Sequence, residues 1–212
     1  MRGANHSMSV TSEPTDPELL ERIAAGDREA LAIVFRRHHR TVYRFSRQML
    51  GSIEAAEDVT QDVFVALTKS AGRFSPEVAS LSTYLYGIAR NLVLQRYKKS
   101  RTRMEVNIDD VAGEHEAAFA TSNDPTDAIS RAQAMRQLRQ AILRLPVRYR
   151  EVVVLCELNG LSYEEAATIA GCPIGTVRSR LSRARQMLIA RCRNFLSTET
   201  EMKCLILTKN NC

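Results

Sequence analysis

Residues 161–188 read LSYEEAATIAGCPIGTVRSRLSRARQML and decide the fold of the C-terminal part of the chain. Ser162 followed by Glu165 forms a capping-box pattern, which predicts that a helix begins directly after the serine. Gly171 can adopt a positive φ and end this helix, and Pro173 is tolerated at or just before the start of the next one. The stretch therefore predicts two helices joined by a tight turn.

The second of these helices combines an apolar stripe with an arginine-rich face. Its apolar residues recur at helical spacing and should face the core: Val177, Leu181, Ala184 and Leu188. The outer face then carries Arg178, Ser179, Ser182 and Arg183. Arginine neutralises phosphate charge and makes bidentate contacts with guanine edges, so we expect this helix to enter the major groove of duplex DNA. A solvated basic face on a packing helix is the alternative.

The composition of the 212 residues favours a polyanionic partner. The chain is 44% hydrophobic and 25% charged, and its formal net charge is +6. No segment approaches the roughly 18 consecutive apolar residues of a membrane-spanning helix. The N-terminus lacks the apolar region of a secretion signal. We therefore expect a cytoplasmic protein without membrane insertion.

The cysteines and histidines do not form a recognisable site. The five cysteines contain no Cys-x-x-Cys pair: Cys156, Cys172, Cys192, Cys204 and Cys212. Reduced thiols without a disulfide framework or zinc site are the default expectation. A redox pair of Cys156 with Cys172, or a soft metal bound by the two tail cysteines, is the alternative. We expect no cofactor, no metal and no catalytic residue.

Charge and turn residues divide the chain into five segments. We expect a disordered N-terminus over residues 1–15, a helical unit over 16–104, a flexible acidic linker over 105–127, a second helical unit over 128–196 and a tail over 197–212. The linker contains no lysine or arginine. No segment alternates as a strand does, so the predicted fold class is all-α with two small domains.

The periodicity also places the helices within each unit. The first unit is expected to hold helices over residues 16–25, 28–49, 53–70 and 81–103. The second is expected to hold a helix up to residue 145 and another over 147–158, before the helix-turn-helix. Six residues are expected in the core from the 28–49 helix: Leu31, Val34, Phe35, Val42, Phe45 and Met49. The 53–70 helix should bury one face: Val59, Val63, Ala66 and Leu67.

Three stretches in this order resemble one known family. They are AEDVTQDVF at 56–64, TYLYGIARN at 83–91, and the segment from 145 to 180 that includes the helix-turn-helix. Together they resemble a bacterial extracytoplasmic-function (ECF) sigma factor of the sigma-70 family. Such proteins consist of two helical domains, region 2 and region 4, joined by a linker.

The resemblance implies partners and residue roles. Core RNA polymerase would bind the helix of the first stretch through Asp58, Gln61, Asp62 and Phe64. Recognition of the promoter −10 element would use Ser75, Ser80, Tyr84, Asn91 and Arg96. Basic side chains hold phosphates and aromatic rings stack on unpaired bases, in agreement with that role. The −35 element would be bound by Thr176, Arg178, Ser179, Ser182 and Arg183.

Three positions depart from the family pattern, and two rival functions remain. Tyr84 stands where relatives usually have tryptophan, Gln95 where an acidic residue is common, and Cys156 where a basic residue is common. Family members are often controlled by an anti-sigma factor, so such a partner is expected here. One rival is a helix-turn-helix regulator that acts without polymerase. The other is a nucleic-acid enzyme, which would need clustered carboxylates for metal ions.

Overall fold

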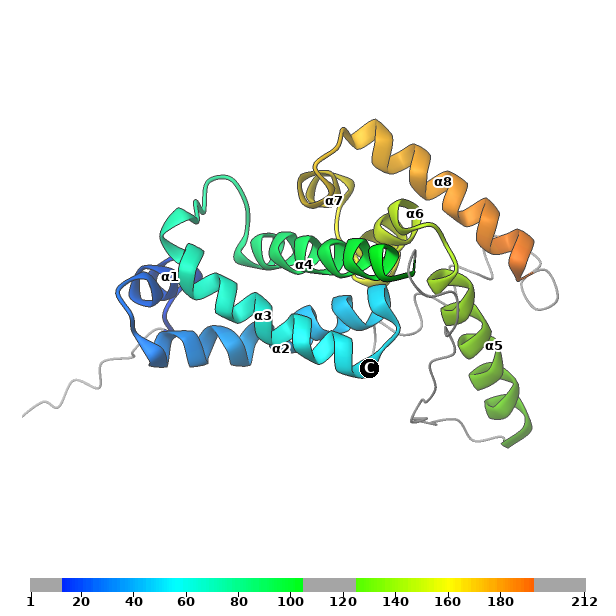
Figure 1. The fold of residues 1–212 in the computed structure, drawn as a ribbon, viewed down its shortest axis with the longest axis horizontal. Coiled ribbons are helices and arrows are strands. Elements are labelled where there is room, and N and C mark those ends of the chain that lie inside the picture. Colours follow the sequence, from blue (N-terminus) through cyan, green and yellow to red (C-terminus); the bar gives the residue numbers. More distant parts are fainter. Residues whose placement is uncertain (1–12, 105–124, 193–212) are drawn as a thin grey trace, which may run out of the picture.

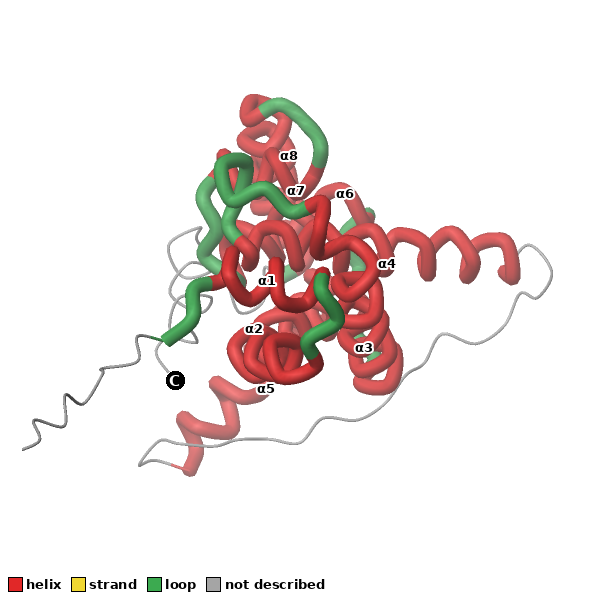
Figure 2. Tube along the Cα trace, turned by 90° about the vertical axis from the view of Figure 1, so that its left-hand side faces the viewer, coloured by secondary structure: helices red, strands yellow, loops and turns green. Residues whose placement is uncertain are grey.

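The computed structural model describes residues 13–104 and 125–192, and within these ranges every regular element is helical (Figures 1 and 2). The all-α prediction is confirmed for this part of the chain. The expected N-terminal disorder up to residue 12, most of the expected linker and the tail from residue 193 lie outside the described residues, as do Cys204 and Cys212.

The first unit contains four α-helices and a short 3-10 turn. Its elements are α1 (Asp16–Ala24), α2 (Arg28–Leu50), α3 (Ile53–Ser70), η1 (Ala71–Arg73) and α4 (Leu81–Met104). The bounds predicted for all four helices are confirmed to within one residue. Asp27 caps α2 by accepting hydrogen bonds from the backbone N–H groups of Glu29 and Ala30, at 2.8 and 3.2 Å. Gly51, with φ of 78°, ends α2 in the left-handed conformation.

The core of the first unit forms where α2, α3 and α4 pack together. Val34, Phe45 and Met49 of α2 are fully buried, and Phe45 meets Tyr86 of α4 edge-on with ring centroids 5.3 Å apart. The prediction that Phe35 belongs to this core is wrong, because its side chain is 40% exposed. The apolar periodicity of α2 is broad enough to include Phe35, but the ring lies at the edge of the buried stripe.

The second unit contains four α-helices and one π-helical segment. They are α5 (Pro125–Leu143), α6 (Val147–Val152), η2 (Val153–Leu158), α7 (Tyr163–Ala170) and α8 (Ile174–Arg191). Helix α5 begins at Pro125, where proline is well suited to the first turn of a helix. The predicted helix over 147–158 is helical throughout, but its second half is the π-helix η2.

Helix α4 is a part of the first unit that faces the second: α2 and α3 lie on one side of it, and α6 and α7 on the other (Figure 1). Arg150 of α6 is 8% exposed and donates to the carbonyl oxygens of Met49 and Leu145, at 2.6 and 3.1 Å. It also donates to the Leu143 carbonyl and to the Tyr97 hydroxyl. Met49 lies in the last turn of α2 and Tyr97 belongs to α4, so one buried guanidinium ties both units together.

Polar contacts of Arg90 and Asn159 extend this interface. Arg90 of α4 forms an ion pair with the buried Glu151 and donates to the Ala170 carbonyl at 3.0 Å. Arg44 donates to the Asn159 side-chain oxygen at 3.0 Å. The amide nitrogen of Asn159 donates to Gln48 at 2.8 Å. We refer to the contacts made by Arg150, Arg90 and Asn159 as the polar interface.

Replacing Arg150 with alanine should destabilise the protein strongly, because it leaves several buried acceptors without a donor. We expect the free energy of unfolding to fall by about 3 kcal/mol. Urea denaturation followed by circular dichroism measures this change. The matched control is Arg144→Ala, which removes an exposed arginine nearby and should alter stability by less than about 0.5 kcal/mol. A loss of stability below about 1 kcal/mol for Arg150→Ala would contradict the conclusion that Arg150 ties the two units together.

Candidate nucleic-acid interface

Helices α7 and α8 form the predicted helix-turn-helix. The Ser162 side chain accepts from the Glu165 backbone N–H at 3.1 Å, and the Glu165 carboxylate accepts from the Ser162 N–H at 2.8 Å. This reciprocal pair is the predicted capping box. Gly171 ends α7 with φ of 61°, and Pro173 immediately precedes α8. The turn geometry inferred from the sequence is confirmed.

The outer face of α8 is open to solvent. The four apolar residues predicted to face the core are all buried: Val177, Leu181, Ala184 and Leu188. The side chains predicted for the opposite face are all exposed: Arg178, Ser179, Ser182 and Arg183. Thr176 is half-buried in the first turn, where its carbonyl accepts from the Ser179 hydroxyl at 3.1 Å. The helix therefore presents a cationic, hydroxyl-bearing surface of the kind that binds a DNA groove.

Two residues of α6 extend this cationic surface. The Arg148 guanidinium lies 4.8 Å from the centroid of the Tyr149 ring. A hydrogen bond from Arg183 lowers the pKa of the Tyr149 hydroxyl, and Arg148 lowers it further. Tyr149 therefore holds two arginines of different helices near one point. Sequence reasoning missed Arg148 and Tyr149, since only the packing of α6 against α8 brings them beside Arg183.

Three arginines of α8 contact other side chains of the second unit. Arg185 pairs with Glu157 of η2, and Arg180 points a nitrogen at the Cys172 sulfur, at 3.9 Å. Arg178 lies over the Tyr163 ring at 5.9 Å from its centroid. These contacts fix arginines close to the open face, so that side-chain ordering is partly complete before any ligand binds.

Helix α4 has an open face between its core face and the polar interface. Arg90 and Tyr97 point to the second unit, whereas Asn91 and Gln95, one helical turn apart, are exposed. Tyr84 is half-buried: its ring meets Phe74 edge-on at 5.5 Å and its hydroxyl donates to the Ser70 carbonyl at 3.3 Å. The ring of Tyr84 is thus held in place at the margin of the open face.

The loop before α4 contributes a cap as well as an exposed edge. The Ser80 hydroxyl accepts from the Thr83 backbone N–H at 3.1 Å and lies 2.9 Å from the Thr83 hydroxyl. Ser80 therefore caps α4, a structural role that the resemblance does not specify. The Ser75 carbonyl accepts from the N–H groups of Val78 and Ala79, which folds the loop into a turn.

Arg96 joins the open face of α4 to the acidic face of α3. Its guanidinium lies 3.3 Å from the Asp58 carboxylate and 3.6 Å from the Asp62 carboxylate. The sequence placed Arg96 at the −10 element and the two aspartates at the polymerase, and the structure brings all three together. Exposed ion pairs of this kind contribute little stability, so they can be exchanged for other partners.

The third candidate surface is the acidic face of α3. Asp58, Gln61 and Asp62 are exposed on it, and Val65, one turn after Gln61, is 55% exposed. Phe64, which the resemblance implies as a polymerase contact, has a side chain that is only 5% exposed. The ring of Phe35 packs edge-on against it with centroids 4.8 Å apart. Phe64 thus belongs to the packed interior, and Phe35 is the exposed ring.

Two family models match the chain in the order of its two units. Sigma-70 region 2 matches residues 34–103, and Sigma-70, region 4 matches residues 135–188. The ECF RNA polymerase sigma factor SigM of Mycobacterium tuberculosis, strain H37Rv, is 32% identical over 191 residues, which are 90% of this chain and 91% of that protein. The chain belongs to the sigma-70 family, in its extracytoplasmic-function group. A sigma factor binds core RNA polymerase and directs it to promoters, and this is the function of the chain.

Two further comparisons agree with this assignment. The ECF sigma factor SigW of Bacillus subtilis, strain 168, is 30% identical over 174 residues, covering 80% of this chain and 92% of SigW. The solved structure of the sigma factor RpoE in complex with the anti-sigma factor NepR, from Bartonella quintana, is similar with a TM-score of 0.61 at 27% identity. That similarity covers 78% of this sigma factor and 98% of RpoE.

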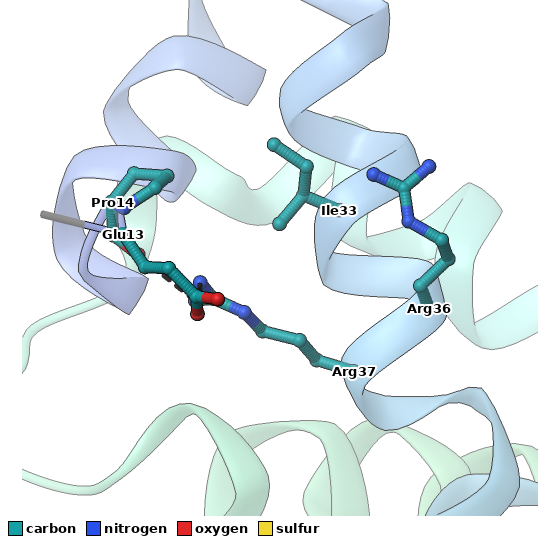
Figure 3. A pocket seen from close by; sticks show the side chains of 5 residues that line it. All are labelled: Glu13, Pro14, Ile33, Arg36 and Arg37. Carbon is teal, nitrogen blue, oxygen red and sulfur yellow. Dashed lines mark hydrogen bonds and ion pairs between the residues drawn. The ribbon is translucent and has the colours of Figure 1, made fainter. Parts of the chain in front are cut away.

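A pocket of about 390 Å³ lies between the N-terminal segment and α2 of the sigma factor (Figure 3). It is lined by Glu13, Pro14, Ile33, Arg36 and Arg37. Arg37 donates to the Pro14 carbonyl at 2.9 Å and pairs with the carboxylates of Glu13 and Asp16, both at 3.2 Å. Arg37 therefore fastens the segment before α1 to α2.

The described residues of the sigma factor contain no cluster of three histidine, cysteine or acidic side chains that could hold a metal ion. Among them, no helix is both long and apolar enough to cross a membrane. Cys156, Cys172 and Cys192 are present as free thiols. Burial, together with the neighbouring Glu157 carboxylate, raises the pKa of the Cys156 thiol to about 11. Cys156 is therefore a poor nucleophile in the folded protein.

The raised pKa of Cys156 predicts slow alkylation. At pH 8 the thiol is protonated in the fold, so iodoacetamide should modify Cys156 at least ~10-fold more slowly in the native protein than in urea. Mass spectrometry of the peptide that contains Cys156 measures both rates, and the urea sample is the internal control. Equal rates in the native and unfolded protein would show that the thiol is neither buried nor shifted.

Proposed function

We propose that the two units divide the promoter between them. The outer face of α8 binds the −35 duplex, the open face of α4 with the preceding loop binds the −10 strand, and the acidic face of α3 binds core RNA polymerase. The observation that carries this proposal is the exposure of all three faces in one fold, each with side chains suited to its partner. The chain acts by binding and positioning, without catalytic chemistry of its own.

Contacts to the −35 element come from α8. Arg178 and Arg183 neutralise phosphates or bind guanine edges, and the hydroxyls of Thr176, Ser179 and Ser182 add hydrogen bonds. Gly171 sets the angle between α7 and α8 and thereby the entry of α8 into the groove. This proposal is supported by the burial of the opposite stripe of α8, because only the face that carries these residues can then contact DNA.

Recognition of the −10 strand uses the open face of α4. Asn91 offers an amide that can pair with a base edge, and the ring of Tyr84 lies at the margin of the same face. Ser75 and the capping Ser80 belong to the loop that completes this surface. Arg96 contacts a phosphate after it leaves its pairs with Asp58 and Asp62.

The acidic face of α3 suits a basic surface on core RNA polymerase. Asp58 and Asp62 supply the charge, and Gln61 lies between them in sequence on the exposed side. An anti-sigma factor is expected to control this protein, because the similar RpoE of Bartonella quintana was solved in complex with one. Since its partners are core polymerase and promoter DNA, the chain acts in the cytoplasm.

The rival regulator that binds DNA without polymerase is not favoured. Such a protein would need only the second unit for DNA binding, whereas the region 2 match covers all of α3, nearly all of α4 and most of α2 in the first unit. Purified chain added to core polymerase with pooled promoter fragments tests the proposal. Transcripts with defined starts that share −35 and −10 elements are expected. Specific binding of the chain to duplex DNA with no transcript would support the rival instead.

Variants of the α8 face test the −35 assignment. Because each lost arginine contact costs about 1–3 kcal/mol, the double change Arg178→Ala with Arg183→Ala should lower promoter-specific transcription at least ~10-fold. Binding to core polymerase alone should not change. Arg191→Ala is the matched control, since it removes an exposed arginine at the other end of α8. Two outcomes contradict the −35 assignment: a loss of transcription in Arg191→Ala, or unchanged transcription in the double variant.

A further inference from the structure

Three rings meet at the surface between α2 and α3, and the outermost is exposed. Phe35 stacks on His39 with centroids 4.9 Å apart and an interplanar angle of 11°. It meets Phe64 edge-on with centroids 4.8 Å apart and an angle of 61°. Phe64 is 5% exposed, whereas Phe35 is 40% exposed. Phe35 therefore covers Phe64 and offers its own remaining surface to solvent.

The ring of Phe35 is held by its neighbours. His39 lies one helical turn further along α2, and its Nδ1 is 3.2 Å from the Phe35 carbonyl oxygen. Phe64 supports the ring from α3, so contacts on two helices restrict its rotation. An aromatic side chain that is fixed before binding loses little conformational entropy in a complex, which is a common property of residues that dominate protein interfaces.

The exposed ring is continuous with the acidic face of α3. Gln61 lies one turn before both Phe64 and Val65, so it separates the Phe35–Phe64 pair from the exposed Val65. Asp58 and Asp62 lie on the same exposed side of the helix. An apolar centre with a charged border is typical of a binding surface. The α3 side of this border is acidic and selects a partner surface of positive charge, whereas the α2 side carries the exposed Arg36 and Arg40.

We propose that Phe35 is the apolar anchor of the polymerase-binding surface, which therefore spans α2 and α3. The proposal rests on the assignment of the acidic face of α3 to core RNA polymerase. The occupant is a cationic surface of core polymerase with an apolar recess that receives the Phe35 ring. Phe64, expected from the sequence to make this contact, supports Phe35 from below.

Affinity for core polymerase in the absence of DNA tests the proposal with the full chain. Because Phe35→Ala removes the anchor, it should raise the Kd at least ~10-fold. Phe35→Tyr keeps the ring and should stay within about threefold of the original affinity. The matched control is Glu21→Ala, which shortens an exposed side chain of α1, outside the three proposed binding faces. Its Kd should not change.

Two additional variants separate the possible failures. Thermal unfolding reports whether Phe35→Ala is folded, and Phe35→Gln, whose stem still covers Phe64, replaces it if it is not. Gln61→Arg places a positive charge on the acidic face and should weaken binding. If Gln61→Arg weakens binding but Phe35→Ala and Phe35→Gln bind normally, the proposal that Phe35 is the anchor is overturned. The assignment of the α3 face to core polymerase then stands. If all of these variants bind core polymerase normally, both are overturned.

Discussion

The arrangement of the two units depends on one buried arginine. Arg150 carries a positive charge into the interface and distributes its donors over carbonyl oxygens at the ends of α2 and α5 and over the Tyr97 hydroxyl of α4. Only a planar guanidinium, with five N–H donors in fixed directions, can serve so many acceptors from one side chain. The result is that three helices from two units converge on one residue of α6.

This convergence assigns a separate task to each side of α4. One side packs into the core of the first unit, a second meets α6 and α7 through Arg90 and Tyr97, and the third remains open with Asn91 and Gln95. The open face of α4 and the outer face of α8 are therefore both accessible. Helices α6 and α7 lie between them, so a few helix diameters of about 10 Å each separate the two faces.

Promoter binding requires a larger separation than this fold provides. The −35 and −10 elements lie roughly 25 base pairs apart, which at about 3.4 Å each is about 85 Å along the duplex. Under the proposed assignment of α8 to the −35 element and α4 to the −10 element, the two units must therefore part when both elements are bound. Water can replace the hydrogen bonds of the polar interface during this movement, whereas the apolar contacts that join the cores of the two units are lost. Arg150 retains the Leu143 and Leu145 carbonyls of its own unit when Met49 and Tyr97 move away.

Local signals in the sequence predicted most of the fold. Ser162, Gly171 and the stripe from Val177 to Leu188 act within a few residues of one another, so their pattern determines the helix-turn-helix directly. Long-range packing could not be predicted in the same way. Whether Phe35 or Phe64 is exposed depends on how α2 lies against α3. The meeting of Arg96 with Asp58, and of Arg150 with Met49, also depends on contacts between distant segments.

The most direct test of this account is the distance between the two units in the free and bound protein. Fluorescence resonance energy transfer between dyes introduced at Glu54 of α3 and Ala190 of α8, both exposed, measures it. The account predicts efficient transfer in the free chain and a large decrease when core polymerase and a promoter are added. Low transfer in the free chain, or transfer that does not change on promoter binding, would contradict a closed arrangement that opens for function.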